Sequence, residues 1–341
     1  LKAALERLVA FPLPVELIET EILPARVDPY HPAWLDALLA ETELEWFGCG
    51  ERKIAFGFAG DRDLALDPDA DEAPAPPDPL LPGELGRYSF ADLLRRSGAD
   101  SGQLLAALWP AAWRGVVAAD SFAPMRQGVA SGFTATTIEL HPPASRRRPS
   151  FDRWRSRLPV AGNWFRLPPP AGAADALDRE EADRDRARLL LERYGLLFRE
   201  LVERELPAMR WSAIFRSLRM LELAGEVIAG PFFDGIPGLQ FMTRAAFREL
   251  EEGLPEDLVW WVNAADPASP CGLPAIDLGL ELPRRVPSNH LVFHGRRLVL
   301  VSERRGARLS ISVGPDHPRL ADYLGVLKTH LGRSVQPRGA I

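Results

Sequence analysis

One arrangement of apolar and turn-forming residues occurs three times along the chain, and this repeat restricts the possible folds more than any other feature. In each copy an apolar helix is followed by a short turn, an amphipathic helix and a strand-like run. Two helices, a turn and a β-hairpin are the components of a winged helix, a variant of the helix-turn-helix. Because the spacing between copies is irregular, the repeat predicts tandem domains rather than a solenoid.

The elements of the three copies can be placed from hydrophobic periodicity and turn residues. The expected helices lie at 32–40, 90–96, 103–113, 186–193, 197–203 and 211–224. The expected strands lie at 44–47, 53–58, 116–117 and 227–228. The first copy has a turn at Gly48 and Gly50 between its two strands, which is typical of a wing.

The helix at 211–224 can be interpreted residue by residue. The apolar residues at helical spacing, expected to face the core, are Trp211, Ile214, Phe215, Leu218 and Leu221. Arg216 and Arg219 then project outward from one face, where a recognition helix would meet DNA backbone or base edges. The alternative is a solvated helix face that carries two arginines without a binding role.

The chain changes character from about Pro255. Short β-prone runs lie at 259–262, 291–293, 297–302 and 308–313. Two of the intervals contain hairpin signals, His294-Gly295 and Arg305-Gly306. A final amphipathic helix is expected at 319–331. We therefore predict an α+β protein with tandem winged-helix domains, then a small antiparallel β-barrel-like module and a C-terminal helix.

Composition shifts divide the chain into six segments. The expected order is a winged-helix-like domain at 1–66, an acidic, proline-rich linker at 67–84, a second winged helix at 85–141, an Arg/Pro-rich connecting segment at 142–178, a third winged helix at 179–254 and the β-barrel-like module with its helix at 255–341. The chain begins at Leu1 rather than Met, which suggests a part of a longer protein.

The formal net charge of −6 argues against nucleic acid, but the charges are unevenly distributed. Acidic residues concentrate at 61–78 and 175–185, whereas 146–157 holds six arginines and only one acid, Asp152. Arginine binds phosphates bidentately and stacks on bases. The predicted phosphate-contacting residues are Arg146, Arg147, Arg148, Arg153, Arg155 and Arg157. Trp154, inside this cluster, is expected to stack on an unpaired base.

Several kinds of chemistry are excluded by what the sequence lacks. None of the three lysines follows a Gly-rich phosphate-binding loop, so we expect no ATP hydrolysis by this chain. The sequence has no nucleophile elbow, and its scattered histidines and two isolated cysteines give no metal-ligand spacing. No apolar run is long enough to span a bilayer, and glutamates interrupt any signal-peptide core. We therefore expect a cytoplasmic protein without a metal or a membrane partner.

Blocks of sequence resemble the C-terminal region of Lhr, the large helicase-related proteins of superfamily 2 (DEAD/DEAH-box) DNA helicases. The resembling blocks are 188–199, 213–227, 232–235, 238–241 and 263–267, with similar segments at 21–27, 32–39 and 108–126. Their joint order covers most of the chain and is more specific than any single block. Arg126, at the end of the last segment, joins the candidate DNA-contacting residues.

The resemblance implies an accessory role in an ATP-dependent helicase associated with DNA repair. In that family two RecA-like motor domains bind ATP and Mg²⁺, and this chain carries neither domain. The implied partners are DNA, single-stranded or forked, and the motor domains of the same polypeptide. This chain itself would need no cofactor.

Two other classes of function stay open. The last part of Lhr resembles winged-helix glycosylases of the AlkZ type, which implies removal of a damaged base by water that a carboxylate activates. Asp266 is the candidate carboxylate, although an Asp before Pro267 is also an ordinary turn residue. The paired glutamines of the AlkZ-type signature are not found. Winged helices also dock proteins, and the overall acidity suits that role. Whether the chain is itself an enzyme is left undecided.

Overall fold

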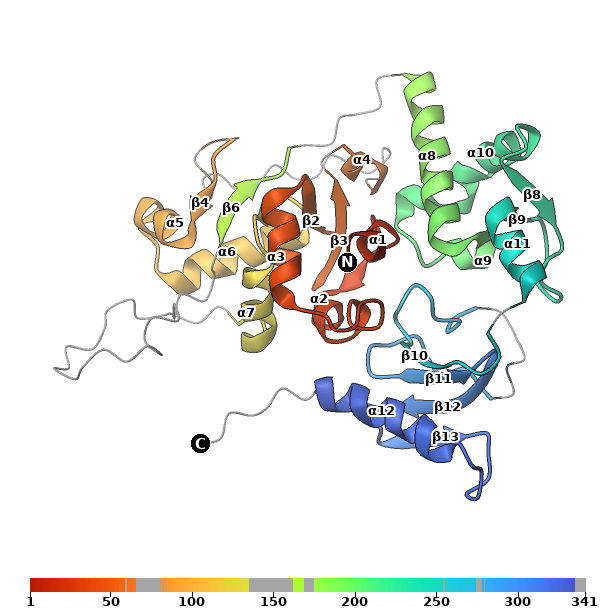
Figure 1. Ribbon diagram of the computed structural model, residues 1–341. Helices are drawn as coiled ribbons and strands as arrows, with labels where there is room; N and C mark the ends of the chain where they lie inside the picture. The colour runs from red at the N-terminus through yellow and green to blue at the C-terminus, as the bar shows by residue number, and fades with distance from the viewer. Residues whose placement is uncertain are drawn as a thin grey trace.

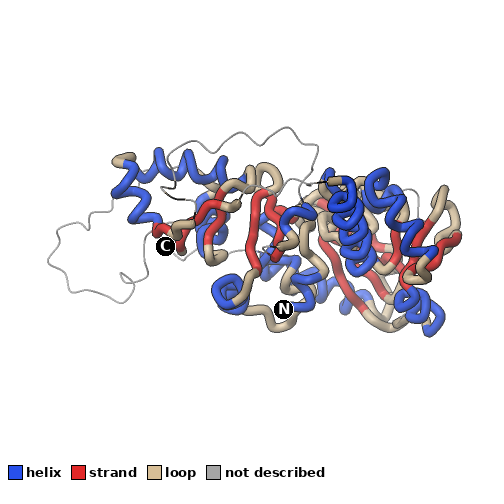
Figure 2. The backbone as a smooth tube through the Cα atoms, turned by 90° about the horizontal axis from the view of Figure 1, so that it is seen from above, coloured by secondary structure: helices blue, strands red, loops and turns tan. Residues whose placement is uncertain are grey.

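The computed structural model consists of helices packed around four antiparallel sheets. The described residues are 1–58, 60–65, 81, 83, 85–134, 162–168, 175–253, 255–273, 278 and 280–334. Three of their sheets have three strands and the fourth has four. Figure 1 shows three units of helices and strands side by side, with the fourth sheet (blue) below the third unit. The view from above in Figure 2 keeps the same order, with the first unit between the second and the third.

The first unit has the helix and strand order of a winged helix. Its elements are α1 (Lys2–Glu6), β1 (Leu13–Pro14), α2 (Val15–Leu17), the π-helix η1 (Ile18–Ile22), α3 (Pro32–Glu41), β2 (Leu44–Gly48) and β3 (Lys53–Phe58). β3 pairs with β1 on one side and β2 on the other. The predicted helix at 32–40 and strands at 44–47 and 53–58 are confirmed. This order makes α3 the recognition-position helix and the β2–β3 hairpin the wing.

The second unit repeats this strand order with a long excursion before its last strand. It contains β4 (Tyr88–Ser89), α5 (Phe90–Ser97), α6 (Ser101–Trp113), β5 (Val117–Ala119), α7 (Ala123–Ser131) and β6 (Asn163–Arg166), and the short α4 (Arg62–Ala65) precedes it. Ser89 caps α5, and a capping box of Asp100 and Gln103 begins α6. Both predicted helices are confirmed.

The position of β6 corrects an expected boundary. This strand falls in the segment 142–178 that was predicted as a connection, yet it pairs with both β4 and β5. The second unit therefore extends beyond residue 141. Periodicity could not link β6 to its sheet, because pairing partners more than 40 residues apart leave no local signal. Of the expected linker at 67–84, residues 67–80 lie outside the described residues.

The third unit follows the same plan without interruption. Its elements are α8 (Ala176–Tyr194), β7 (Leu196–Leu197), α9 (Arg199–Val202), the 3₁₀ helix η3 (Pro207–Met209), α10 (Trp211–Leu223), β8 (Val227–Gly230), β9 (Gln240–Thr243) and α11 (Arg244–Glu252). β9 lies between β7 and β8. Within the wing, the buried Gln240 side chain exchanges hydrogen bonds with the backbone of Phe233. Gln240 thus fixes the wing loop, and α10 occupies the recognition-helix position.

The fourth sheet is open, which corrects the expectation of a barrel-like module. β10 (Val259–Asn263), β11 (His290–His294), β12 (Arg297–Glu303) and β13 (Arg308–Ile311) form a meander in chain order. A closed barrel requires its first and last strands to pair, but β10 and β13 are the two edges of this sheet. α12 (Leu320–Ser334) covers one face through Tyr323 and Leu327. A second apolar cluster covers the other face, so burial of both faces replaces closure.

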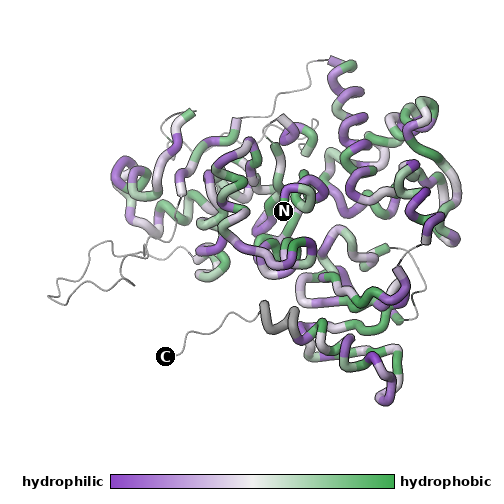
Figure 3. The backbone as a smooth tube through the Cα atoms, viewed as in Figure 1, coloured by the Kyte–Doolittle hydropathy of each residue, from purple (hydrophilic) through white to green (hydrophobic). Residues whose placement is uncertain are grey.

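One hydrophobic cluster runs through all three winged-helix-like units, while the fourth sheet has two small cores of its own. Figure 3 shows the apolar segments inside the units and a largely hydrophilic α8 at the surface. The first and second units approach at backbone distance. A Cβ added at Gly48 would lie 1.9 Å from the carbonyl oxygen of Ala112, and one at Gly115 would lie 2.8 Å from that of Gly48. Trp46 also packs edge-on against Trp164.

Candidate nucleic-acid interface and the junction pocket

The third unit presents the two arginines predicted on its recognition-position helix. Ile214, Leu218 and Leu221 are buried as expected, and Arg216 is exposed on the opposite side of α10. However, the Arg216 guanidinium lies 3.0 Å from Glu180 Oε1 of α8. Arg219 pairs with Glu222 one turn along its own helix. Both cations therefore face carboxylates, which weakens their attraction for a phosphate.

The recognition-position helices of the other two units carry no lysine or arginine. On α3 the exposed side chains include Ala33, Trp34 and Ala37, and on α6 they include Gln103 and Ala106. Such faces can pack against a partner or a base, but they contribute no positive charge. Attraction for the phosphate backbone must therefore come from other parts of the chain.

Arg126 lies on α7 of the second unit, and its side chain contacts two carboxylates of the first unit. Its guanidinium donates to both carboxylate oxygens of Glu19, at 2.5 and 2.9 Å, and to Asp36 Oδ2 at 2.6 Å. Glu19 also accepts a 2.6 Å hydrogen bond from the hydroxyl of Tyr30. This network joins the second unit to the first. The phosphate contact expected of Arg126 conflicts with this geometry, because two carboxylates already bind its guanidinium.

The main predicted basic cluster lies outside the described residues. It comprises Arg146, Arg147, Arg148, Arg153, Trp154, Arg155 and Arg157. Along the chain the cluster stands between α7 and β6, within the connection that joins strands β5 and β6 of the second unit. In a winged helix the connection between these two strands is the wing.

Asp266, the candidate glycosylase carboxylate, forms an ion pair with the first unit. It follows β10, is 1% exposed, and accepts a hydrogen bond of 2.7 Å at each oxygen from Arg26. One of these oxygens also accepts the Ala268 N–H at 2.8 Å. A bidentate pair of this kind is among the strongest that side chains form. In this arrangement the Asp266 carboxylate links the β-module to the first unit, and both of its oxygens are occupied by Arg26.

Two further arginines hold the same loop from other directions. Arg204 of the third unit donates to the carbonyl oxygen of Ser269 at 2.6 Å, and Arg285 of the fourth module donates to that of Ala265 at 2.8 Å. Burial lowers the pKa of both guanidinium groups, and hydrogen bonds to the carbonyl oxygens offset part of that cost. The first unit, the third unit and the β-module are therefore joined at loop 264–270.

A buried polar cluster lies beside this loop. Glu21 of η1 accepts a hydrogen bond from the Asn263 side chain, and its Oε2 lies 3.1 Å from His290 Nε2. The Asn263 amide also donates to the carbonyl oxygen of Pro287 at 2.9 Å. All three residues of the cluster are buried, from Glu21 at 5% exposed to Asn263 and His290 at 1%. Because this polar group replaces apolar packing, it favours one specific arrangement of the first unit on the β-module.

This junction explains two of the sequence blocks that resemble Lhr. The block 21–27 supplies Glu21 and Arg26, and the block 263–267 supplies Asn263 and Asp266. The residues pair across about 240 positions of sequence. No local pattern could have revealed the contact. The only available signal was the presence of charged residues in two otherwise apolar blocks.

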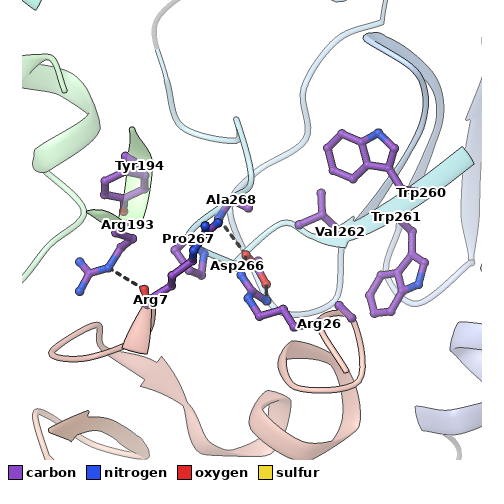
Figure 4. Close-up of a pocket in the computed structure, with 11 residues that line it drawn as sticks. Arg7, Arg26, Arg193, Tyr194, Trp260, Trp261, Val262, Asp266, Pro267 and Ala268 are labelled. Atoms are coloured by element: carbon purple, nitrogen blue, oxygen red, sulfur yellow. Dashed lines mark hydrogen bonds and ion pairs between the residues drawn. The ribbon is translucent and has the colours of Figure 1, made fainter. Parts of the chain in front are cut away.

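A pocket of about 280 Å³ opens at the junction. Figure 4 shows Arg7 on one side, Trp260 and Trp261 of β10 on the other, and Asp266 with the adjacent Arg26 between them. The Trp260 ring stacks on Phe293 with 4.4 Å between ring centroids, and its indole N–H donates to the carbonyl oxygen of Gly295. Cationic and aromatic side chains around a space of this size match the groups that hold an unstacked base.

Other chemistry has little support in the described part of the chain. Among those residues no cluster of three or more His, Cys, Asp or Glu is placed to bind a metal ion. Burial raises the pKa of the Cys49 thiol to about 12 and also raises that of Cys271, which disfavours thiolate reactivity. None of the helices in this part of the chain combines the length and apolar character that a bilayer crossing requires.

Comparison with known proteins agrees with this architecture. The family models described as large helicase-related protein, winged-helix domain, match residues 1–59 and 176–261. A protein of Mycolicibacterium smegmatis named Lhr helicase/probable uracil glycosylase is 30% identical over 93% of this chain and 22% of its own length. Lhr helicase/uracil glycosylase of Escherichia coli is 28% identical over 91% of the chain and 21% of its own length.

A solved structure shares the fold. The DNA glycosylase AlkZ of Streptomyces sahachiroi superposes with a TM-score of 0.52 at 15% identity, covering 97% of this chain and 90% of AlkZ. The chain spans about a fifth of the length of the curated relatives it matches. The winged-helix matches and the similarity along nearly the whole chain together show a C-terminal region of the large helicase-related (Lhr) type.

Proposed function

We propose that the chain is the nucleic-acid-binding accessory part of the C-terminal region of a large ATP-dependent helicase that acts in DNA repair. The observation that carries this proposal is the winged-helix strand order in three successive units that share one core. Such a row offers one extended surface for single-stranded or forked DNA. The motor domains, which bind ATP and Mg²⁺, belong to other parts of the same polypeptide. As they translocate, the DNA strand would move along this surface.

The arginine cluster that we propose for phosphate contact lies in the sequence between α7 and β6, outside the described residues. Arg126, Arg216 and Arg219 all face carboxylates. The cluster Arg146, Arg147, Arg148, Arg153, Arg155 and Arg157 has one acid within it. Phosphate neutralisation by such a cluster depends on ionic strength and not on base sequence. Trp154 would stack on an unpaired base.

The direct test is a salt titration of DNA binding. The triple variant Arg146→Ala, Arg147→Ala and Arg148→Ala is expected to weaken binding to single-stranded and forked DNA of any sequence. It should also lower the slope of log K against log salt by about two units. The double variant Arg216→Ala and Arg219→Ala is the control and should change the slope by less than about half a unit. An unchanged slope in the triple variant would reject the assignment of phosphate contacts to this cluster.

A second candidate function is base excision, favoured by the junction pocket. Both relatives carry uracil glycosylase in their names, and AlkZ shares the fold. In this proposal the pocket between Arg7 and Trp261 receives a flipped base, and Asp266 turns away from Arg26 to activate water. Release of uracil that is abolished by Asp266→Asn but retained in Arg26→Lys would support catalysis by the carboxylate. Equal loss in both would indicate only a broken ion pair.

Protein docking is the outcome that remains if the chain binds no DNA at low salt. The exposed faces of α3 and α6, which carry no lysine or arginine, would then be the surfaces to examine. Binding to fluorescent single-stranded, forked and uracil-containing DNA, with a check for base release, separates the three functions in one series of measurements.

A further inference from the structure

The β-module contains a second arginine-rich stretch, and its arginines are placed differently from those of α10. Between residues 282 and 315 there are seven arginines, and the only acid is Glu303. Arg285 is bound to backbone carbonyl oxygens, Arg296 lies 3.6 Å from Glu256, and Arg308 lies 3.4 Å from Glu303. Arg284, Arg297, Arg304 and Arg305 are exposed and have no ion pair among the described residues, and Arg284, Arg304 and Arg305 lie at one end of the sheet whereas Arg297 lies at the other.

The fold brings Arg284, Arg304 and Arg305 together by means of one buried side chain. Asn289 is 4% exposed, and its amide donates to the carbonyl oxygen of Arg284 at 2.9 Å. Its side-chain oxygen accepts the N–H of Arg304 at 3.1 Å. The N–H of Arg305 donates to the carbonyl oxygen of the neighbouring Ser288 at 2.8 Å. Asn289 therefore joins the loop before β11 to the turn between β12 and β13.

The turn between β12 and β13 also has an unusual backbone. Arg304 and Arg305 have φ angles of 52° and 55°, and Gly306 follows with φ of 86°. Residues with a Cβ rarely adopt the left-handed region, and two in succession require support from their surroundings. The hydrogen bonds from Asn289 and Ser288 provide that support. These hydrogen bonds fix the backbone of the turn, and the side chains of Arg304 and Arg305 are exposed to solvent.

The position of this turn relates it to the rest of the molecule. It lies at the end of the sheet where His290 begins β11 and Asn263 ends β10. At that end Glu21 of the first unit contacts both His290 and Asn263. The arginines therefore stand at the same end of the sheet as the junction with the first winged helix.

We propose that Arg284, Arg304 and Arg305, here called the arginine turn, bind the phosphodiester backbone of a nucleic acid. The proposal rests on the proposed DNA-binding function and adds a contact site in the β-module, outside the winged helices. Unpaired, clustered cations on a fixed backbone gain more from a phosphate than the carboxylate-paired arginines of α10, because no existing ion pair has to be broken. The same cluster would contact DNA of any sequence.

The β-module supplies a matched control for the test. Arg304 and Arg305 form a doublet at one end of the sheet, and Arg296 and Arg297 form a doublet at the other. The variants to compare are Arg304→Gln with Arg305→Gln and Arg296→Gln with Arg297→Gln. Each pair removes the same charge from an exposed hairpin, so a general electrostatic effect would be equal in both. Thermal unfolding should be unchanged in either pair.

Binding of the whole chain to single-stranded DNA is measured over a salt series. The arginine-turn variant should lower the slope of log K against log salt by about 1.4, for two lost contacts, and the control by less than about 0.3. The charge-preserving pair Arg304→Lys and Arg305→Lys should retain the wild-type slope. Equal slopes in the arginine-turn and control variants would overturn this proposal while leaving winged-helix binding intact. Absence of DNA binding by the wild-type chain would overturn both.

Discussion

The first unit forms two joints that differ in how deeply their charged groups are buried. Its joint with the second unit combines an apolar contact, made by the close backbone approach at Gly48 and the packing of Trp46 against Trp164, with the partly exposed ion pairs of Arg126 to Glu19 and Asp36. Its joint with the β-module is polar, built from the Arg26–Asp266 pair and the buried cluster around Glu21. Both joints contain ion pairs, but those of Arg126 are partly open to water, whereas Asp266 and the cluster around Glu21 are almost completely buried. A buried charge that loses its partner costs more than an exposed one, so the joint with the β-module is the more sensitive to single substitutions.

The largest expected effect is that of Arg26→Ala on the polar joint. The Asp266 carboxylate is 2% exposed and would be left buried without its cation. Loss of one partner from a buried pair costs about 3 kcal/mol in the free energy of unfolding. Urea denaturation measures this loss, and Arg26→Lys should recover part of it. A loss below about 1 kcal/mol would mean that the joint does not depend on this pair.

A somewhat smaller loss in the free energy of unfolding is expected when a substitution overpacks the apolar contact at Gly48. In Gly48→Ala the new methyl group would meet the Ala112 carbonyl oxygen at 1.9 Å, so the backbones of two units must separate. Overpacking of this kind costs about 2 kcal/mol. Gly314→Ala is the control, because nothing lies within 4 Å of its added Cβ. Equal unfolding temperatures in the two variants would contradict a close approach at Gly48.

The rate at which the Cys49 thiol is alkylated reports on the apolar contact between the first and second units. The backbone of Cys49 lies next to Gly50, whose N–H donates to the carbonyl oxygen of Trp113 in the second unit. Burial raises the pKa of the Cys49 thiol to about 12, so the thiol is protonated at pH 8. Alkylation by iodoacetamide, followed by mass spectrometry, should therefore be slow in the wild-type chain and faster in Gly48→Ala. Rapid alkylation of the wild type would show that the joint opens readily.

The smallest effect is expected for the exposed ion pairs of α10. Arg216→Ala removes a pair with Glu180 in which the two side chains are 79% and 47% exposed. Such pairs contribute less than about 0.5 kcal/mol to stability. Urea denaturation should show this variant close to the wild type. A loss in the free energy of unfolding as large as that of Arg26→Ala would contradict the expectation that buried arginine pairs stabilise the fold more than exposed ones.

The sequence predicted the local elements closely and the sheet partners only in part. The helix at 211–224, for example, is observed as Trp211–Leu223, with Ile214, Leu218 and Leu221 in the core. Hydrophobic periodicity is a local signal, so it identified helices, hairpins and their buried faces. It could not identify β6 as a partner of β4 and β5, nor show that β10 and β13 do not pair with each other. Those contacts join residues that are distant in the chain.

The charged residues illustrate the same division. By itself the sequence determined where arginines concentrate, that the chain lacks a phosphate-binding loop, and which helix faces carry Arg216 and Arg219. Only the tertiary structure decided that Arg126 and Arg26 hold units together and that Arg216 faces Glu180, while Arg304 and Arg305 have no ion pair among the described residues. An arginine's role depends on which carboxylates the fold places near it, because Coulomb attraction depends on distance in space and burial rather than on separation in sequence.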